Sequence, residues 1–309
     1  MTETTARPAR RRLAAATALC AAALAVGSAA TAHAATADAA AVSYARALNG
    51  QTVAVSTARP STPVHPEAIT HPQLDYMGST VAAHEKSAAA TASVVTPLAV
   101  PQLPGIDVSS YQGNINWATV APHIDFSYTK ATEGTYYTNP DFANQYNGPY
   151  DNGVIRGSYQ FAIPNNSTGS AQADYFIAHG GGWSADGKTL PGALDIEYNP
   201  YGAECYGLSQ ASMVSWVHSF VNEYAAKEHA YPVIYTTTDW WTSCTGNSAA
   251  FASEDPLWVA NYTASGGGTL PAGWGYYTFW QYADSGSQPG DQDVFNGASA
   301  QLQTLATTG

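Results

Sequence analysis

The sequence predicts an α/β fold: a closed, TIM-like barrel of eight strands with helices around it. Three observations predict it. Short apolar or alternating runs recur eight times between residues 104 and 297, helical patterns separate the early runs, and acidic or aromatic side chains stand where the runs end. Strands that alternate with helices favour a parallel sheet, and eight such strands favour closure into a barrel.

The expected strands follow the chain in order, near 104–109, 125–130, 154–162, 192–198 and 232–237, and then within PLWVANYT, YYTFWQYAD and QDVFNG. The clearest helix is expected at 209–228, where Met213, Trp216, Val217 and Phe220 follow helical spacing and Ser209 is a plausible N-cap. Weaker helical patterns cover 140–152 and 169–180. Loops rich in Gly and Pro between the last three strands leave little room for helices.

The compact domain is expected to begin near Pro101. The first hundred residues hold two aromatic residues, Tyr44 and Tyr76, whereas 34 lie in 101–309. Aromatic side chains supply much of the buried area of a core. We therefore expect a single catalytic domain at 101–309, preceded by a low-complexity pro-region or spacer at 35–100 that is rich in Ala, Thr, Ser, Val and Pro.

The N-terminus is typical of an export signal. Four arginines between positions 7 and 12 precede an Ala-rich apolar run from Leu13 to Val26, and TAHAA offers a cleavage site after Ala34. We expect residues 1–34 to be a secretory signal peptide and the protein to be extracellular, with no stable membrane association after cleavage. The alternative is an uncleaved membrane anchor, which this short run disfavours.

Two cysteines, Cys205 and Cys244, remain once Cys20 leaves with the signal. An even pair in an exported protein predicts one disulfide, and two buried free thiols are the alternative. No zinc site is expected, because the chain has no CxxC and no cluster of Cys and His.

The domain is acidic. From residue 101 onward there are four Lys or Arg and 18 Asp or Glu, a formal charge of −14. A nucleic-acid partner is therefore not expected, since binding phosphates requires a basic face. A neutral polymer such as a glycan is compatible with this charge.

The candidate site consists of polar and aromatic residues at the strand ends, because the active site of such a barrel forms at the C-terminal ends of its strands. They are, in chain order, Asp107, Lys130, Glu133, Tyr159, Phe161, Asp195, Glu197, Tyr235, Trp258, Asn261, Trp280, Gln281 and Asp293.

Asp195 and Glu197, in LDIEYN, carry the strongest signal. Side chains two apart on a strand point to the same face, so both acids point into the barrel while Leu194, Ile196 and Tyr198 face the helices. Neighbouring carboxylates in a partly dry cleft repel each other, which favours one protonated and one ionised group. Glycoside cleavage uses that division of roles. The alternatives are a solvated strand edge and a site for a divalent cation.

An ordered set of motifs resembles glycoside hydrolase family 25, the Chalaropsis-type lysozymes, and most closely the secreted actinomycete muramidases. The motifs are GIDVSSYQGNINW at 105–117, YTKATEG at 128–134, GSYQFA at 157–162, LDIEYN at 194–199, VIYTT at 233–237, LWVANY at 257–262 and FWQYADSGSQPGDQDVFNG at 279–297. The resemblance covers 103–305.

The resemblance implies an irregular (β/α)5(β)3 barrel and hydrolysis of the β-1,4 bond between N-acetylmuramic acid and N-acetylglucosamine in peptidoglycan, with tolerance of 6-O-acetylated muramic acid. It implies that Glu197 is the general acid/base, Asp195 its partner carboxylate, and Asp107 and Asp293 the outer acids of the cleft. Eight further strand-end residues are expected to bind substrate: Lys130, Glu133, Tyr159, Phe161, Tyr235, Trp258, Asn261 and Trp280. We expect a monomer without cofactor or metal.

Two roles remain open for Asp195: a nucleophile, or an anion that orients the substrate's own 2-acetamido group. Acids two apart on one strand cannot easily flank a sugar from opposite faces, which favours the second role. Both routes retain anomeric configuration. The rival functions are a related hexosaminidase or chitin-type glycosidase, a non-catalytic wall-binding module and a metal-dependent hydrolase.

Overall fold

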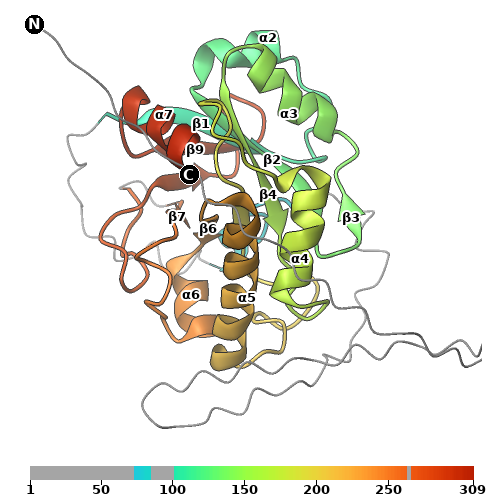
Figure 1. The fold of residues 1–309 in the computed structure, drawn as a ribbon, viewed down its shortest axis with the longest axis vertical. Helices are drawn as coiled ribbons and strands as arrows, with labels where there is room; N and C mark the ends of the chain where they lie inside the picture. The colour runs from blue at the N-terminus through green and yellow to red at the C-terminus, as the bar shows by residue number, and fades with distance from the viewer. Residues whose placement is uncertain (1–72, 85–100, 263–265) are drawn as a thin grey trace, which may run out of the picture. The chain divides into compact units, whose positions relative to one another are not determined.

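The computed structural model describes residues 73–84, 101–262 and 266–309, and all of them belong to one compact unit (Figure 1). The expected signal peptide at 1–34 and most of the expected spacer at 35–100 lie outside the described residues. Residues 73–84 are the part of the spacer that is described, and they end in the short helix α1 (Val81–His84).

The described part of the chain forms a closed barrel. The strands are β1 (Leu103–Val108), β2 (Phe126–Glu133), β3 (Tyr137–Thr138), β4 (Ile155–Phe161), β5 (Ala193–Asp195), β6 (Val233–Thr236), β7 (Leu257–Ala260), β8 (Phe279–Ala283) and β9 (Asp291–Phe295). The sheet order is β1-β9-β8-β7-β6-β5-β4-β2-β3, and pairing of β1 with β2 closes the barrel. β3 adds a short hairpin to β2, which the sequence patterns did not indicate.

Helices pack around this barrel, with α4, α5 and α6 along one side (Figure 1). The helical elements after α1 are α2 (Trp117–Val120), η3 (Ala121–His123), α3 (Phe142–Asp151), α4 (Gly169–Phe176), η4 (Ile177–Gly181), α5 (Gln210–Glu228), α6 (Thr238–Thr245) and α7 (Ser299–Thr308). The three expected helices are confirmed as α3, α4 with η4, and α5. Ser209 caps α5 as expected, because its side chain accepts a hydrogen bond from the backbone N–H of Ser212.

Two apolar layers lie on opposite sides of the sheet. Leu194, Ile196 and Tyr198 pack outward with residues of α4 and α5, among them Phe176 and Phe220. The inner layer joins side chains from most of the strands: Phe126, Tyr128, Tyr159, Ala193, Val233, Tyr235, Trp258, Phe279 and Phe295. The alternation expected for LDIEYN is therefore confirmed on its apolar side.

The expected parallel sheet is correct for every barrel strand except β9, which is antiparallel to both β1 and β8. Only residues 284–290 connect β8 to β9, and a parallel connection needs a dozen or more residues to cross the sheet. The direction matters for the site, because an antiparallel strand places its first residues, not its last, at the mouth of the barrel.

A disulfide joins Cys205, in the loop after β5, to Cys244 in α6, with Cα atoms 5.3 Å apart. The pairing expected from the sequence is present. It ties the loop after the two central acids to the helix that follows β6.

We expect the double variant Cys205→Ala/Cys244→Ala to lose about 3–4 kcal/mol of the free energy of unfolding, because the bond closes a loop with a sequence separation of 39 residues. Equilibrium denaturation measures the loss. The exposed neighbour Ser243→Ala is the control and should unfold as the wild type does. An unchanged free energy in the double variant would show that the bond does not stabilise the domain.

Candidate active site

Asp195 and Glu197 lie at the end of β5, inside the barrel. Asp195 is the last residue of the strand and pairs with Phe161 of β4 and Tyr235 of β6. The backbone N–H of Ile196 donates to the carbonyl of Tyr235 at 3.0 Å, so the extended conformation continues beyond the strand. Both carboxylates are buried, at 0% and 1% exposure. Two acids are thus held next to each other on one face, away from water.

Asp195 has no hydrogen-bond partner for either carboxylate oxygen among the described residues. Burial raises its pKa well above the ordinary value, and the charge of Glu197 raises it further. An unpartnered buried carboxylate is costly in its ionised form. This side chain is therefore free to bind an incoming group, and it is stabilised by any donor that arrives.

Glu197 has two hydrogen-bond donors, both from residues 73–84. The backbone N–H of Gly78 donates to its Oε1 at 2.6 Å, and the hydroxyl of Thr80 donates to its Oε2 at 3.2 Å. Burial raises the pKa of Glu197 to about 7, although these two hydrogen bonds lower it. A carboxyl group whose pKa lies near neutrality can both give and take a proton, as a general acid/base must.

Three further acids line the wall formed by β1 and β9. Asp107 pairs in register with Asp291, and Asp293 lies two residues further along β9, so all three share the inner face. Burial raises the pKa of Asp107 to about 8, and it raises the values of Asp291 and Asp293 well above the ordinary one, with the charge of Asp107 as the next cause.

Gln281 of β8 organises this wall. Its amide nitrogen donates to Asp107 at 2.7 Å and to Asp291 at 3.2 Å. Its amide oxygen accepts from the hydroxyls of Tyr235 at 2.6 Å and Tyr262 at 2.8 Å. Both ends of the amide are used, so the side chain is fixed between the acids and the tyrosines.

Lys130 and Glu133 form a buried ion pair of 2.7 Å on β2. They are three residues apart, yet their partners on β4, Tyr159 and Phe161, are two apart, because the register shifts between Lys130 and Thr132. The bulge brings both charges to one face. Burial alone would lower the pKa of Lys130, but the carboxylates of Glu133 and Asp75 outweigh it and raise the pKa.

The expected substrate-binding residues separate into two groups. Tyr159 and Tyr235 belong to the inner layer and point into the barrel among the acids. The ring centroid of Phe161 lies 4.9 Å from the Lys130 ammonium. Trp258 is fully buried below them and donates from its indole N–H to Asp293 at 3.1 Å, so it holds an acid rather than offering an open face.

Asn261 and Trp280 lie apart from these groups. Trp280 packs against the outer apolar layer, because neighbouring residues on β8 alternate and Gln281 takes the inner position. Its indole N–H donates to the Asn261 carbonyl at 2.8 Å, and the Asn261 side chain donates to Gly266 in the following loop.

Sequence patterns missed three sets of site residues: Asp291, the segment 73–84, and two tyrosines in loops. Asp291 and Asp293 have the same spacing as Asp195 and Glu197, so the alternation rule could have found Asp291 once β9 was extended by one residue. Residues 73–84 contact Glu197 through a backbone amide, which no residue pattern encodes. Tyr262 and Tyr201 come from loops.

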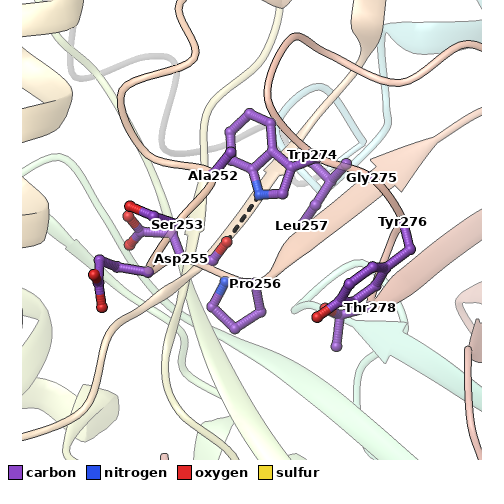
Figure 2. A pocket seen from close by; sticks show the side chains of 10 residues that line it. Ala252, Ser253, Asp255, Pro256, Leu257, Trp274, Gly275, Tyr276 and Thr278 are labelled. Atoms are coloured by element: carbon purple, nitrogen blue, oxygen red, sulfur yellow. Dashed lines mark hydrogen bonds between the residues drawn. The ribbon is translucent and has the colours of Figure 1, made fainter.

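A pocket of about 140 Å³ opens beside β7 and contains none of these acids (Figure 2). Asp255, Pro256, Trp274 and Tyr276 are among its lining residues, and the indole N–H of Trp274 donates to the Asp255 carbonyl at 2.9 Å. Burial is the main cause that raises the pKa of Asp255 to about 8, and the charge of Glu254 is the second. This pocket has one buried acid, whereas the site at the barrel mouth has two neighbouring buried acids that can divide the roles of proton donor and anion.

Potential metal ligands come close together at another place in the described residues, where Glu204 lies beside Cys205 and Cys244. Both sulfurs are already joined in the disulfide, so this group provides one carboxylate and no thiolate. The arrangement at the barrel mouth suits proton transfer and charge stabilisation by carboxyl groups.

Comparisons with known proteins find relatives of this chain. The model of the family described as glycosyl hydrolases family 25 matches residues 106–291. The N,O-diacetylmuramidase of Chalaropsis sp is 51% identical over 207 residues, which are 66% of this chain and 98% of that protein. Lysozyme M1 of Streptomyces globisporus is 49% identical over 208 residues, 65% of this chain and 70% of that one.

A solved structure resembles the barrel as well. The muramidase from Acremonium alcalophilum is 56% identical, with a TM-score of 0.65, and the match covers 67% of this chain and 100% of that chain. The whole of that solved chain is matched by two thirds of this one.

We expect the melting temperature of the full chain to fall as the pH rises from about 5 to about 8. Asp107 and Glu197 have raised pKa values of about 8 and 7, so the folded chain holds protons that the unfolded chain has released. Their contribution is fully present below the unfolded pKa and is lost as the pH rises through the folded values.

Calorimetry across this range measures the effect, and Asp107→Asn should reduce the slope because an amide has no proton to lose. The exposed Asp151→Asn variant is the control and should keep the wild-type slope. A melting temperature that rises with pH would contradict the raised pKa values.

Proposed function

The chain belongs to glycosyl hydrolases family 25, and from this premise we propose how its acids cleave a glycan. It is a lysozyme-type glycoside hydrolase that acts on peptidoglycan, as relatives about half identical in sequence are named lysozyme and N,O-diacetylmuramidase. The bond cleaved is the β-1,4 bond between N-acetylmuramic acid and N-acetylglucosamine. A chitin-type glycosidase and a non-catalytic wall-binding module are less consistent with these relatives.

Glu197 is the general acid/base. The observation that carries this role is its burial at the end of β5 with a pKa raised to about 7. The protonated side chain donates its proton to the glycosidic oxygen as the bond to C1 breaks. The resulting carboxylate then takes a proton from the water that attacks C1, which returns the enzyme to its starting state.

Asp195 orients the 2-acetamido group, and the donor that this group supplies favours the anionic form of Asp195, which stabilises the positive charge that develops on the sugar. Its two unpartnered oxygens support this role, because the acetamido N–H supplies the missing donor. Its position two residues from Glu197 on one strand supports it too, since both acids approach the sugar from the same side. The acetamido oxygen attacks C1, and water later opens the ring so formed, with net retention.

The outer wall positions the substrate. Asp107, Asp291 and Asp293 present a row of acceptors whose orientation is fixed by Gln281 and Trp258. Tyr159 and Lys130 offer donors to sugar hydroxyls, and the hydroxyl oxygen of Tyr235, whose proton is donated to Gln281, offers an acceptor. The relatives named N,O-diacetylmuramidase favour tolerance of O-acetylated muramic acid in this cleft.

The protein acts outside the cell as a monomer, after removal of residues 1–34. The basic and apolar pattern of those residues and a substrate in the bacterial wall support export. No helix in the described part of the chain is long and apolar enough to span a bilayer.

We expect Glu197→Gln to reduce the rate of wall lysis at least about 100-fold, because the amide cannot transfer a proton. The assay uses residues 101–309, the span expected to fold alone, and follows the turbidity of bacterial walls. The exposed Glu254→Gln is the matched control and should keep wild-type activity. Near-full activity in Glu197→Gln would remove the proposed role, and products ending in reducing N-acetylglucosamine rather than muramic acid would point to another glycosidase.

The two roles of Asp195 predict different products with a 2-fluoro glycoside that lacks the acetamido group. Acetamido assistance predicts no covalent adduct by intact mass, and inhibition by a thiazoline that mimics the cyclised acetamido group. A stable glycosyl adduct on Asp195 would instead establish it as the nucleophile.

A further inference from the structure

Residues 73–84 insert apolar side chains into the barrel. Met77 and Val81 are fully buried, and they belong to the same inner cluster as Tyr159, Tyr235 and Trp258. A segment that only crossed the surface of the barrel would leave such side chains exposed. These two residues instead fill the apolar part of the cavity that the acids surround.

The same segment occupies both oxygens of the proposed general acid. Gly78 and Thr80 each donate one hydrogen bond to Glu197. Hydrogen bonds to a carboxylate favour its ionised form, and both are among the causes that lower the pKa of this group. With the segment in place, a glycosidic oxygen has no access to the proton donor.

Besides the contacts with Glu197, an ion pair and four hydrogen bonds hold the segment. Asp75 accepts from Lys130 through its carboxylate at 3.2 Å and also through its backbone carbonyl, and the Tyr201 hydroxyl donates to it at 2.9 Å. The Met77 N–H donates to the Tyr159 hydroxyl at 3.3 Å, and Gln281 donates to the Met77 carbonyl at 3.4 Å.

Two of these partners, Lys130 and Tyr159, are groups that our account assigns to the sugar. The ammonium of Lys130 and the hydroxyl of Tyr159 would otherwise face the cleft. The peptide groups of Met77 and Gly78 also have the same chemistry as an N-acetyl group, a C=O and an N–H on one C–N bond. The segment and an N-acetylated glycan therefore compete for the same atoms.

Only a glycine fits at the centre of this contact. Gly78 has φ of +82°, and a Cβ there would lie 2.5 Å from the amide oxygen of Gln281 and closer still to the Tyr262 hydroxyl. Both atoms belong to the fixed hydrogen-bond network of the wall, so neither can move without breaking it. The close approach of this backbone to Glu197 depends on the absence of a side chain.

We propose that residues 73–84 are an intramolecular inhibitor that occupies the glycan cleft, so that the full chain is a latent lysozyme until the segment leaves the cleft. The inference rests on the proposed function of the cleft. The whole of a solved muramidase chain is matched by two thirds of this one, which is consistent with a further segment in this chain.

Rates of wall lysis by the full chain, with residues 101–309 as the uninhibited reference, test the proposal. We expect the full chain to be at least tenfold slower than the reference, and Gly78→Ala in the full chain to recover most of the difference. Gly153→Ala is the matched control, since Gly153 has φ of +83° but no atom within 4 Å of an added Cβ. It should remain as slow as the wild type.

A synthetic peptide of residues 73–84 provides the second measurement. It should raise the apparent KM of the 101–309 enzyme without changing kcat, and the same peptide with Gly78→Ala should not. Hydrogen exchange of the 73–84 amides in the full chain reports docking without any activity: slow in the wild type and in Gly153→Ala, and fast in Gly78→Ala.

The outcomes separate the two proposals. A full chain that lyses walls as fast as residues 101–309, or fast amide exchange in its segment, overturns the inhibitor. Absence of lysis by residues 101–309 themselves counts against the proposed function, and the exchange rates then still decide whether the segment occupies the cleft.

Discussion

The burial of several carboxyl groups in one barrel interior is the constraint on which the rest of this structure depends. Asp107, Asp195, Glu197, Asp291 and Asp293 all lie at 2% exposure or less. Five ionised acids cannot be held there, because desolvation and mutual repulsion both raise their pKa values. The group is instead held by shared protons and by donors on rigid strands, chiefly Gln281 and Trp258. Protons available near neutral pH are what glycoside cleavage requires.

The same constraint links the segment at 73–84 to the chemistry. Without substrate, a buried Glu197 needs donors, and the segment supplies two through Gly78 and Thr80. It also supplies Asp75 to the ion pair of Lys130 and Glu133. When the segment leaves, Glu197 loses two hydrogen bonds that lower its pKa and also part of the burial that raises it. Release of the segment would open the cleft to substrate and leave both oxygens of Glu197 accessible.

The alternation of apolar and polar residues predicted much of the barrel and its central acids, because residues buried on one face of a strand are apolar at every second position. The direction of β9 cannot be predicted from such a pattern. Its antiparallel course follows from the connection after β8, which is too short to cross the sheet; the length of that connection indicates the direction, and its residue types do not. The bulge in β2 that brings Glu133 beside Lys130, and the outward side of Trp280, depend on register, which a single strand pattern does not contain. The docking of 73–84 depends on the backbone of one glycine and on two buried apolar side chains. Within a region rich in Ala and Thr, so few residues do not predict a structured segment.

The titration of Glu197 tests the central claim most directly. Carboxyl carbon chemical shifts of the folded chain, assigned by comparison with Glu197→Gln, follow this one group as the pH changes. Our account predicts a transition near the raised pKa of about 7, coupled to the titration of the neighbouring Asp195, whose pKa is also raised. A simple transition at the ordinary glutamate value of about 4.3 would contradict it, because the barrel would then hold an ordinary ionised pair and no proton donor at neutral pH.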